Sequence, residues 1–276
     1  MRKLIAIAFR LLFSIDYLKP HYFGLHKRIF GPLNLFKGVS FEILYRNDLK
    51  MIVHISDWIQ QNLYFMNEYE EKEIRFLEKF LQKGDTFIDV GANIGLFSLV
   101  ASKQIGETGK VFAFEPIQKN FNHLIQHIQL NNLTNIQYEK LAVSNKQGEI
   151  ELYLNEQDSD SGTATAFAEV FTSAERAITI PLDDYFVGKE SVIVKLIKMD
   201  IEGGEYLALQ GMSKLLKRDK PTLLIEINED APYDKTLLYS LLQNIGYRMA
   251  YLDQNGDLIN EKLEEDNSNN FLFICT

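Results

Sequence analysis

The sequence predicts an α/β protein with a doubly wound, mostly parallel sheet of seven strands, preceded by an N-terminal extension of helices and a β-hairpin. Apolar runs alternate with stretches of helical periodicity from Phe87 to Ile245, which is typical of a parallel sheet covered by helices. The chain has 276 residues, of which 46% are hydrophobic, and this is enough for one large core. We assign residues 1–83 to the extension and 84–276 to the α/β domain. The strands are expected at residues 86–90, 111–115, 136–143, 193–199, 222–227, 247–253 and 270–275.

The first residues of the extension are apolar and basic. The segment from Met1 to Ile15 resembles the start of a signal peptide, but Arg10 interrupts it, no small-residue cleavage site follows, and it is too short to span a bilayer. Up to Arg28 there are six Lys or Arg residues and a single acid, Asp16. Two interpretations stay open, namely an interfacial helix on an anionic membrane and an amphipathic helix packed on the body or on a second subunit.

The remainder of the extension predicts regular structure. Residues 38–55 alternate like a β-hairpin with its turn at Arg46-Asn47-Asp48, and Asp57 and Glu68 each open a helical stretch. Aromatic residues here are more often core than the wall of a substrate pocket, so we expect core positions for Trp58, Tyr64, Phe65 and Tyr69.

The most informative motif is the apolar strand that runs into Asp89-Val-Gly91-Ala-Asn93-Ile-Gly95 and then into a helix. Gly91 allows a sharp turn, Gly95 allows close approach, and the helix offers unpaired N–H groups, so the turn is expected to hold a nucleoside cofactor. A dinucleotide fingerprint would read G-x-G-x-x-G with no carboxylate at the strand end. Asp89 would repel a pyrophosphate, but it can pair with the ammonium group of S-adenosylmethionine (SAM). The motif therefore favours SAM over a nicotinamide cofactor, and over an NAD-dependent dehydrogenase.

A second apolar run, Val111-Phe-Ala-Phe, ends in Glu115 and Pro116. An acid about twenty residues after the glycine turn accepts the ribose hydroxyls in nucleotide-binding βαβ units, so Glu115 is the predicted ribose ligand. Pro116 is expected to lie beside the adenine, and the backbone near Ala142 to read the adenine edge.

These motifs resemble the FkbM family of SAM-dependent methyltransferases. The resemblance rests on DVGANIG from Asp89, FEP from Phe114, AVSN from Ala142 with a following Gly148, LDD from Leu182, and KMDIEGGE from Lys198, and it covers about half of the chain. It implies a class I methyltransferase with a Rossmann-like sheet, and transfer of a methyl group to a hydroxyl of a sugar, glycolipid or secondary metabolite. The class usually has an acid after the third strand, and this sequence has Leu141-Ala142-Val143 there.

Methyl transfer to a hydroxyl also needs a group that accepts a proton, or a metal. None of the five histidines ends a predicted strand, so the candidates are the carboxylates Asp200, Glu226 and Glu202, in that order. Asp200 and Glu226 follow neighbouring strands and would share a Mg²⁺ ion, or would repel one another so that one becomes a base. The alternative role of Asp200 is structural, as the cap of the helix that follows it. His123 and His127 have zinc-ligand spacing but no third ligand, and we expect them to be exposed.

Two segments interrupt the alternation of strands and helices. Residues 155–177 are polar and rich in small residues, and we interpret them as a lid over the acceptor, with a surface insertion as the alternative. Residues 254–270 are expected to form a solvated hairpin loop.

Composition limits the partners. A net charge of −9 argues against nucleic acid, because phosphate binding needs a basic face. The single cysteine, Cys275, cannot form an internal disulfide, which fits a reducing cytoplasm. We expect a small-molecule, glycan or glycolipid acceptor, cytoplasmic localisation and peripheral membrane contact through the N-terminus. The competing hypothesis is a non-catalytic module of the same fold that docks on membrane-associated glycan machinery.

Overall fold

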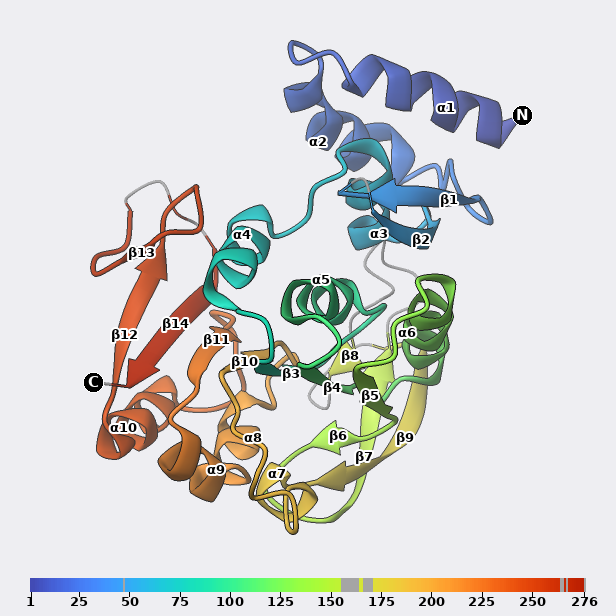
Figure 1. Cartoon of the computed structure of the whole chain (residues 1–276). Coiled ribbons are helices and arrows are strands. Elements are labelled where there is room, and N and C mark those ends of the chain that lie inside the picture. Colours follow the sequence, from blue (N-terminus) through green and yellow to red (C-terminus); the bar gives the residue numbers. More distant parts are fainter. Residues whose placement is uncertain (47, 155–163, 166–170, 264–265, 267, 276) are drawn as a thin grey trace. The chain divides into compact units, whose positions relative to one another are not determined.

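The central sheet has eight strands in the computed structural model, which describes residues 1–46, 48–154, 164–165, 171–263, 266 and 268–275 (Figure 1). Its order is β13-β12-β14-β11-β10-β3-β4-β5. The strands β11, β10, β3, β4 and β5 are parallel neighbours, whereas β14, β12 and β13 pair antiparallel. This confirms the predicted fold class. The bounds are β3 Thr86–Val90, β4 Lys110–Phe114, β5 Ile136–Glu139, β10 Leu196–Met199, β11 Thr222–Glu226, β12 Tyr247–Leu252, β13 Leu258–Ile259 and β14 Asn270–Cys275.

The third predicted strand, 136–143, is wrong in its second half. The central strand β5 ends at Glu139, and Ala142–Val143 form β6 of a separate four-stranded sheet. This sheet has the order β6-β9-β7-β8, where β7 is Gly148–Leu154, β8 is Ala164–Thr165 and β9 is Ser173–Ile180.

The predicted lid over 155–177 is partly wrong as well. Residues 173–177 belong to β9, which pairs antiparallel with β7 from Ser173 opposite Leu154 to Thr179 opposite Gly148. Ala177 is buried and Ile178 is exposed, so the strand has one covered face. Residues 155–163 and 166–170 of the predicted lid lie outside the described residues. The predicted loop 254–270 contains the short strand β13.

Helices cover both faces of the central sheet (Figure 1). One face carries α4 Glu71–Phe80, α5 Leu96–Ile105 and α6 Gln118–Leu130. The other carries α7 Leu182–Tyr185, α8 Glu205–Gln210, α9 Ser213–Asp219 and α10 Lys235–Ile245, whose apolar residues form one core cluster with the sheet.

The chain divides into two units before α4, at Glu70, whereas we predicted the boundary after α4, at residue 83. Helix α4 belongs to the α/β unit because Lys72 pairs with Asp266 at 2.7 Å and Lys79 pairs with Asp257 at 2.6 Å. Its backbone also passes close to Gly256, where a Cβ atom would lie 2.6 Å from the carbonyl oxygen of Lys72.

The N-terminal unit, Met1–Glu70, has an aromatic core and the predicted hairpin. The hairpin consists of β1 Ser40–Tyr45 and β2 Leu49–His54, and it is followed by α3 Trp58–Phe65, whose N-cap Asp57 accepts a hydrogen bond from the Gln60 N–H at 3.0 Å. Helix α1 Arg2–Phe13 is followed by short helical turns, η1 Lys19–His21, α2 Tyr22–Leu25 and the π-helical η2 His26–Phe30. Among the described residues, no helix combines the length and apolarity needed to span a membrane.

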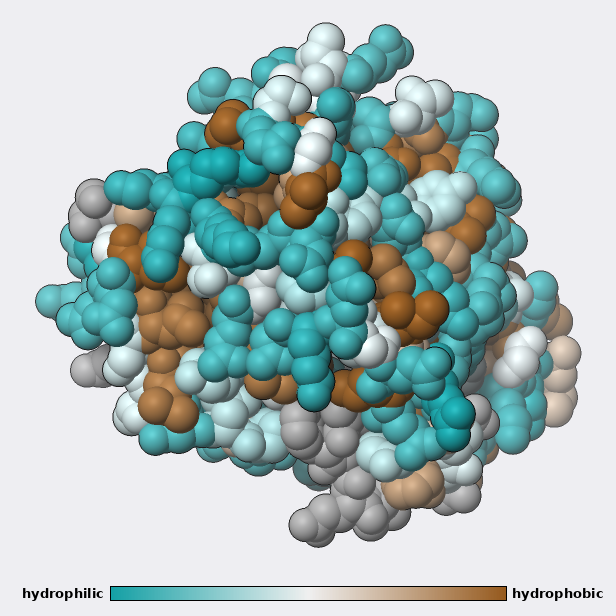
Figure 2. Space-filling model, turned by 90° about the horizontal axis from the view of Figure 1, so that it is seen from below, coloured by the Kyte–Doolittle hydropathy of each residue, from teal (hydrophilic) through white to brown (hydrophobic). Residues whose placement is uncertain are grey.

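Figure 2 shows one face of the molecule, and this face is mostly hydrophilic. Its hydrophobic residues occur in small separate patches rather than in one continuous area, which is ordinary for a protein surface.

Candidate functional site

The predicted site residues of the α/β unit lie at the carboxyl ends of its central strands. Strands β4 and β5 lie on one side of β3, and β10 and β11 lie on the other, so the strand order reverses between β3 and β10. Ligands of open α/β sheets bind in the crevice at such a reversal. Asp89 is near the end of β3, Glu115 directly follows β4, and Asp200 directly follows β10.

Asp89 is 1% exposed and has one hydrogen-bonded oxygen. The Ser98 hydroxyl donates to its Oδ2 at 2.6 Å, whereas its Oδ1 is buried and receives no hydrogen bond from any residue in the described part of the chain. Burial raises the pKa of Asp89, and the nearby Lys198 ammonium opposes this rise. A buried carboxylate oxygen without a donor is poised to receive a cationic group from a ligand.

The turn after Asp89 depends on its two glycines. Gly91 has φ +81°, and a Cβ atom there would lie 1.9 Å from the carbonyl oxygen of Asp200. Gly95 has φ +93°, and its Cβ would lie 2.6 Å from Leu124. Asn93, between them, also has a positive φ of 51°. The turn therefore brings the backbone of β3 against that of β10 at the strand reversal.

Glu115 is 4% exposed and holds this turn. Its Oε2 accepts a hydrogen bond from the Asn93 N–H at 2.8 Å, and its Oε1 accepts one from the Ile117 N–H at 2.9 Å. Burial raises the pKa of Glu115 to about 7, although the hydrogen bonds from Ile117 and Asn93 lower it. The Asn120 side chain also donates to Glu115, so one acceptor position on the carboxylate remains for a hydroxyl of a ligand.

Pro116 and Ala142 lie in different layers of the α/β unit. Pro116 is half-buried between Glu115 and α6. Ala142 is half-buried in β6 of the second sheet, where it packs against the small core cluster of Ile117, Leu152 and Ala177. Ala142 therefore does not belong to the central sheet.

Lys198 belongs to the candidate site, and the sequence reasoning missed it. It is 5% exposed, it lies opposite Asp89 in the register of β10 with β3, and its Nζ donates to Asp200 Oδ2 at 2.9 Å. The ammonium also lies over the Phe97 ring, 4.8 Å from its centre. Residues two apart in a strand share a face, so the spacing of Lys198 and Asp200 could have indicated the pair.

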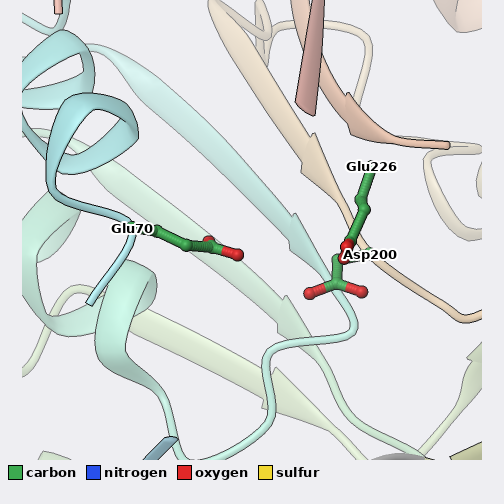
Figure 3. Close-up of side chains that lie close together, drawn as sticks. All are labelled: Glu70, Asp200 and Glu226. Atoms are coloured by element: carbon green, nitrogen blue, oxygen red, sulfur yellow. The ribbon is translucent and has the colours of Figure 1, made fainter. Parts of the chain in front are cut away.

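Asp200 and Glu226 come together, as predicted from their neighbouring strands. Their carboxylate oxygens lie within 4.8 Å of one another, and Figure 3 shows the two groups side by side. Burial raises the pKa of Asp200, but the charge of Lys198 and the hydrogen bonds from Glu226 and Lys198 outweigh it, so this pKa lies below its usual value. A hydrogen bond between two carboxyl groups needs a proton on one of them.

Glu202 occupies a strained position in the turn after β10. It has φ +50°, which is rare for a residue other than glycine, and it accepts a hydrogen bond from Asn228 Nδ2 at 3.1 Å. Burial, followed by the negative charges of Asp200 and Glu205, raises the pKa of Glu202 to about 7. Strain and a shifted pKa in one residue are typical of functional sites.

Glu205 stabilises this turn. It is 2% exposed and accepts hydrogen bonds from the N–H groups of Gly203 at 3.1 Å and Ile201 at 3.3 Å, and from the Tyr233 hydroxyl at 3.0 Å. Burial raises the pKa of Glu205, and these hydrogen bonds oppose the rise. Its contacts are those of a residue that holds the first turn of α8.

The histidines on α6 differ from the prediction. His127 is fully buried rather than exposed, because its Nδ1 is hydrogen-bonded to the Ile94 carbonyl oxygen at 2.8 Å, and His123 is half-buried. Among the described residues, neither belongs to a group of side chains that could hold a metal ion.

The fold and the candidate site define an α/β unit with acids at the ends of its central strands, and a family model matches this part of the chain. The model of the methyltransferase FkbM domain matches residues 89–249, more than half of the chain. The chain belongs to this family of SAM-dependent methyltransferases, as the motifs indicated. A search of the curated proteins gave no match.

Solved structures of methyltransferases are similar at low identity. A methyltransferase FkbM from Methylobacillus flagellatus KT is 18% identical with a TM-score of 0.45, over 79% of this chain and 55% of that one. An rRNA methylase from Streptococcus thermophilus is 16% identical with a TM-score of 0.43, over 72% of this chain and 90% of that one. A SAM dependent methyltransferase from Aquifex aeolicus is 19% identical with a TM-score of 0.40, over 78% of this chain and 96% of that one.

Proposed function

We propose that this methyltransferase transfers a methyl group from SAM to a hydroxyl group of a sugar, glycolipid or secondary metabolite. The observation that carries the proposal is Glu202, whose pKa is raised to about 7. A general base works best when its pKa lies near the working pH. A hydroxyl acceptor must lose its proton, whereas an amine acceptor needs less help from a base, so Glu202 favours O-methylation over N-methylation.

The residues of the turn fit SAM. The donor-free Oδ1 of Asp89 suits the ammonium of the methionyl group, and the acceptor position that remains on Glu115 suits a ribose hydroxyl. We assign the backbone of Gly91, Asn93 and Gly95 to the contacts with the rest of the cofactor. SAM supplies an electrophilic methyl group when it is bound.

The acids after β10 would handle the acceptor proton. Glu202 takes the proton of the acceptor hydroxyl. Lys198 lowers the pKa of Asp200, and the negative charge of Asp200 in turn helps to raise the pKa of Glu202. Glu226 shares a hydrogen bond with Asp200 and so fixes its orientation. In this proposal Glu202 replaces Asp200 as the first candidate base.

A Mg²⁺ ion held by Asp200 and Glu226 fits these residues poorly. The Lys198 ammonium already occupies Asp200 Oδ2 at 2.9 Å and supplies a positive charge there. We therefore propose a proton-sharing pair of acids at this position, and turnover that survives treatment with EDTA.

The test separates cofactor binding from chemistry. Calorimetry should detect binding of SAM or S-adenosylhomocysteine, and labelled SAM incubated with cell-extract fractions should give a labelled product that identifies the acceptor. Glu202→Gln should lower turnover by roughly a hundredfold or more and leave the affinity for SAM unchanged. Glu229→Gln, on an exposed residue of the same region, is the matched control and should have no effect. Full turnover in Glu202→Gln would refute the assignment of the base.

The competing hypothesis of a non-catalytic docking module makes the opposite prediction. If the protein acts by docking, Asp200→Asn should keep its biological activity, whereas an enzyme should lose turnover and still bind SAM.

We also propose a peripheral membrane contact through α1. The helix has a buried face with Ala6 and Phe13 and an opposite face on which Leu4 is 71% exposed and Leu11 is 67% exposed. Residue Ile15, just beyond the helix, is 51% exposed on the same side. The helix carries three cations and no acid, which suits an anionic lipid surface.

Flotation with vesicles tests this contact. Vesicles of phosphatidylcholine with phosphatidylglycerol should retain the protein, and pure phosphatidylcholine should retain much less. The double variant Leu4→Gln/Leu11→Gln should bind the anionic vesicles about tenfold more weakly. The matched control is Leu44→Gln, on an exposed residue of β1. Equal retention by both kinds of vesicle, or no loss in the double variant, would contradict the proposal.

A further inference from the structure

The N-terminal unit contains a cavity of about 610 Å³, and all of its lining residues belong to that unit. Its lining comes from α2, η2, the segment that follows η2, and the start of α3. This volume lies within the range of small-molecule sites and exceeds what a few waters need.

One wall of the cavity is aromatic. Trp58, which we expected in the core, is only half-buried and lines the cavity together with Phe23. The indole is held by Tyr22, stacked at 5.8 Å between ring centres, and by His26 at 4.3 Å. A fixed, partly exposed indole is a surface on which the apolar side of a sugar ring can pack.

The floor of the cavity is polar and ordered. His26 is 7% exposed and Gln61 is 3% exposed, and both line the cavity. Gln61 Nε2 donates to the Ile55 carbonyl oxygen at 2.8 Å, so its Oε1 must be the acceptor for Tyr22 and for His26 Nδ1. The ring of His26 therefore has a fixed orientation, with Nε2 as the nitrogen for a hydroxyl of a ligand.

The charge of the lining is positive. Lys27 and Lys37 line the cavity, and no acidic residue does among those described. Both lysines are exposed, so their ammonium groups can reach an anion at the mouth without being buried.

We propose that this cavity binds a phosphorylated sugar, with the sugar ring on Trp58, a hydroxyl on His26 and the phosphate between Lys27 and Lys37. The same chemistry occurs in a soluble sugar phosphate and in the headgroup of a lipid whose phosphate bears a polyol. The site does not depend on the proposed methyl transfer, because it uses only residues of the N-terminal unit.

Trp58 is the single tryptophan of the chain, so intrinsic fluorescence reports on this cavity directly. Titration with glucose 1-phosphate should give a saturable change, whereas glucose and inorganic phosphate should give a change only at concentrations at least about tenfold higher, because each lacks one half of the recognised chemistry. In a second titration, the same fluorescence is measured with vesicles that contain phosphatidylinositol. A response at lower concentration than glucose 1-phosphate assigns the site to a lipid, and the reverse assigns it to a soluble ligand.

Charge variants complete the test. Lys27→Gln and Lys37→Gln should each weaken binding of glucose 1-phosphate about fivefold, and Lys50→Gln, an exposed lysine of β2 outside the cavity, should not. No saturable response to either probe, an equal response to inorganic phosphate, or the same loss in all three variants would overturn the proposal.

Discussion

Replacing Lys198 with Met should destabilise the protein through charge rather than through volume. The Lys198 side chain is 6% exposed and bonds Asp200 at 2.9 Å, and Met fills a similar space without the ammonium. Removing one partner of a buried ion pair costs about 3–5 kcal/mol. Because the Asp200 side chain is 24% exposed and partly hydrated, we expect a loss near the lower end, about 3 kcal/mol at pH 7, or a fall in Tm of roughly 6–12 °C.

The pH dependence identifies the cause of this loss. The pKa of Asp200 lies below its usual value, so the pair contributes stability that is present above the unfolded pKa and is lost as the pH falls through the folded pKa. The difference between wild type and Lys198→Met, measured by urea unfolding, should therefore be full at pH 7 and shrink below about pH 4. Lys195→Met, on an exposed lysine three residues earlier, should cost less than about 1 kcal/mol.

A double variant distinguishes the effect of charge from the effect of packing. Lys198→Met/Asp200→Asn should recover part of the loss, since it no longer leaves a buried carboxylate without its cation. A loss that is equal at about pH 3 and at pH 7, or that is unchanged by the second substitution, would show that packing and not charge is responsible.

The remaining predictions concern the acids and one glycine. The folded pKa of Glu115, about 7, exceeds its ordinary value of 4.5, so ionisation of Glu115 should lower the free energy of unfolding by up to about 3 kcal/mol as the pH rises from about 4.5 to 7. Glu115→Gln has no such ionisation, so its free energy of unfolding, measured with urea, should differ less between pH 5 and pH 8 than that of the wild type. Gly91→Ala should cost about 3–5 kcal/mol because its Cβ meets the carbonyl oxygen of Asp200, whereas Gly188→Ala, with φ +78° and open space, should cost only about 1 kcal/mol; equal losses would contradict the steric argument. Glu205→Ala should cost about 3 kcal/mol in the same unfolding assay by leaving two backbone N–H groups without acceptors, and a near-zero effect would show that water replaces the carboxylate.

The cofactor turn could be predicted from the sequence because its chemistry is local. A buried strand, an acid, two glycines and a helix follow one another within a few residues, and the structure places them as expected. The ammonium of Lys198 could not be placed beside Asp89 in the same way. That contact depends on the register of β10 with β3, which are more than a hundred residues apart in the chain.

The second sheet escaped prediction for a different reason. Its strand β6 follows β5 after only two residues, and β9 begins inside a polar segment rich in small residues. Local composition describes which residues can be exposed, but it does not show which strand supplies the neighbouring hydrogen bonds. The cavity at Trp58 could not be predicted from the sequence either, because a cluster of aromatic residues is typical of a hydrophobic core unless its packing is known.

The charges at the strand ends explain why the turn suits a cation. Asp89, Glu115, Asp200, Glu202 and Glu205 are all buried or half-buried in one region, and Lys198 is the single basic side chain that the described contacts place among them. Burial is the main cause of the raised pKa values of four of these acids, and the described contacts place one basic side chain among five acids, so acids outnumber bases in this region. A ligand with an ammonium and a sulfonium relieves this imbalance, whereas a dinucleotide pyrophosphate increases it. Selection of SAM over a nicotinamide cofactor thus follows from the whole set of acids as well as from Asp89, and Lys198 limits how much positive charge the ligand must bring.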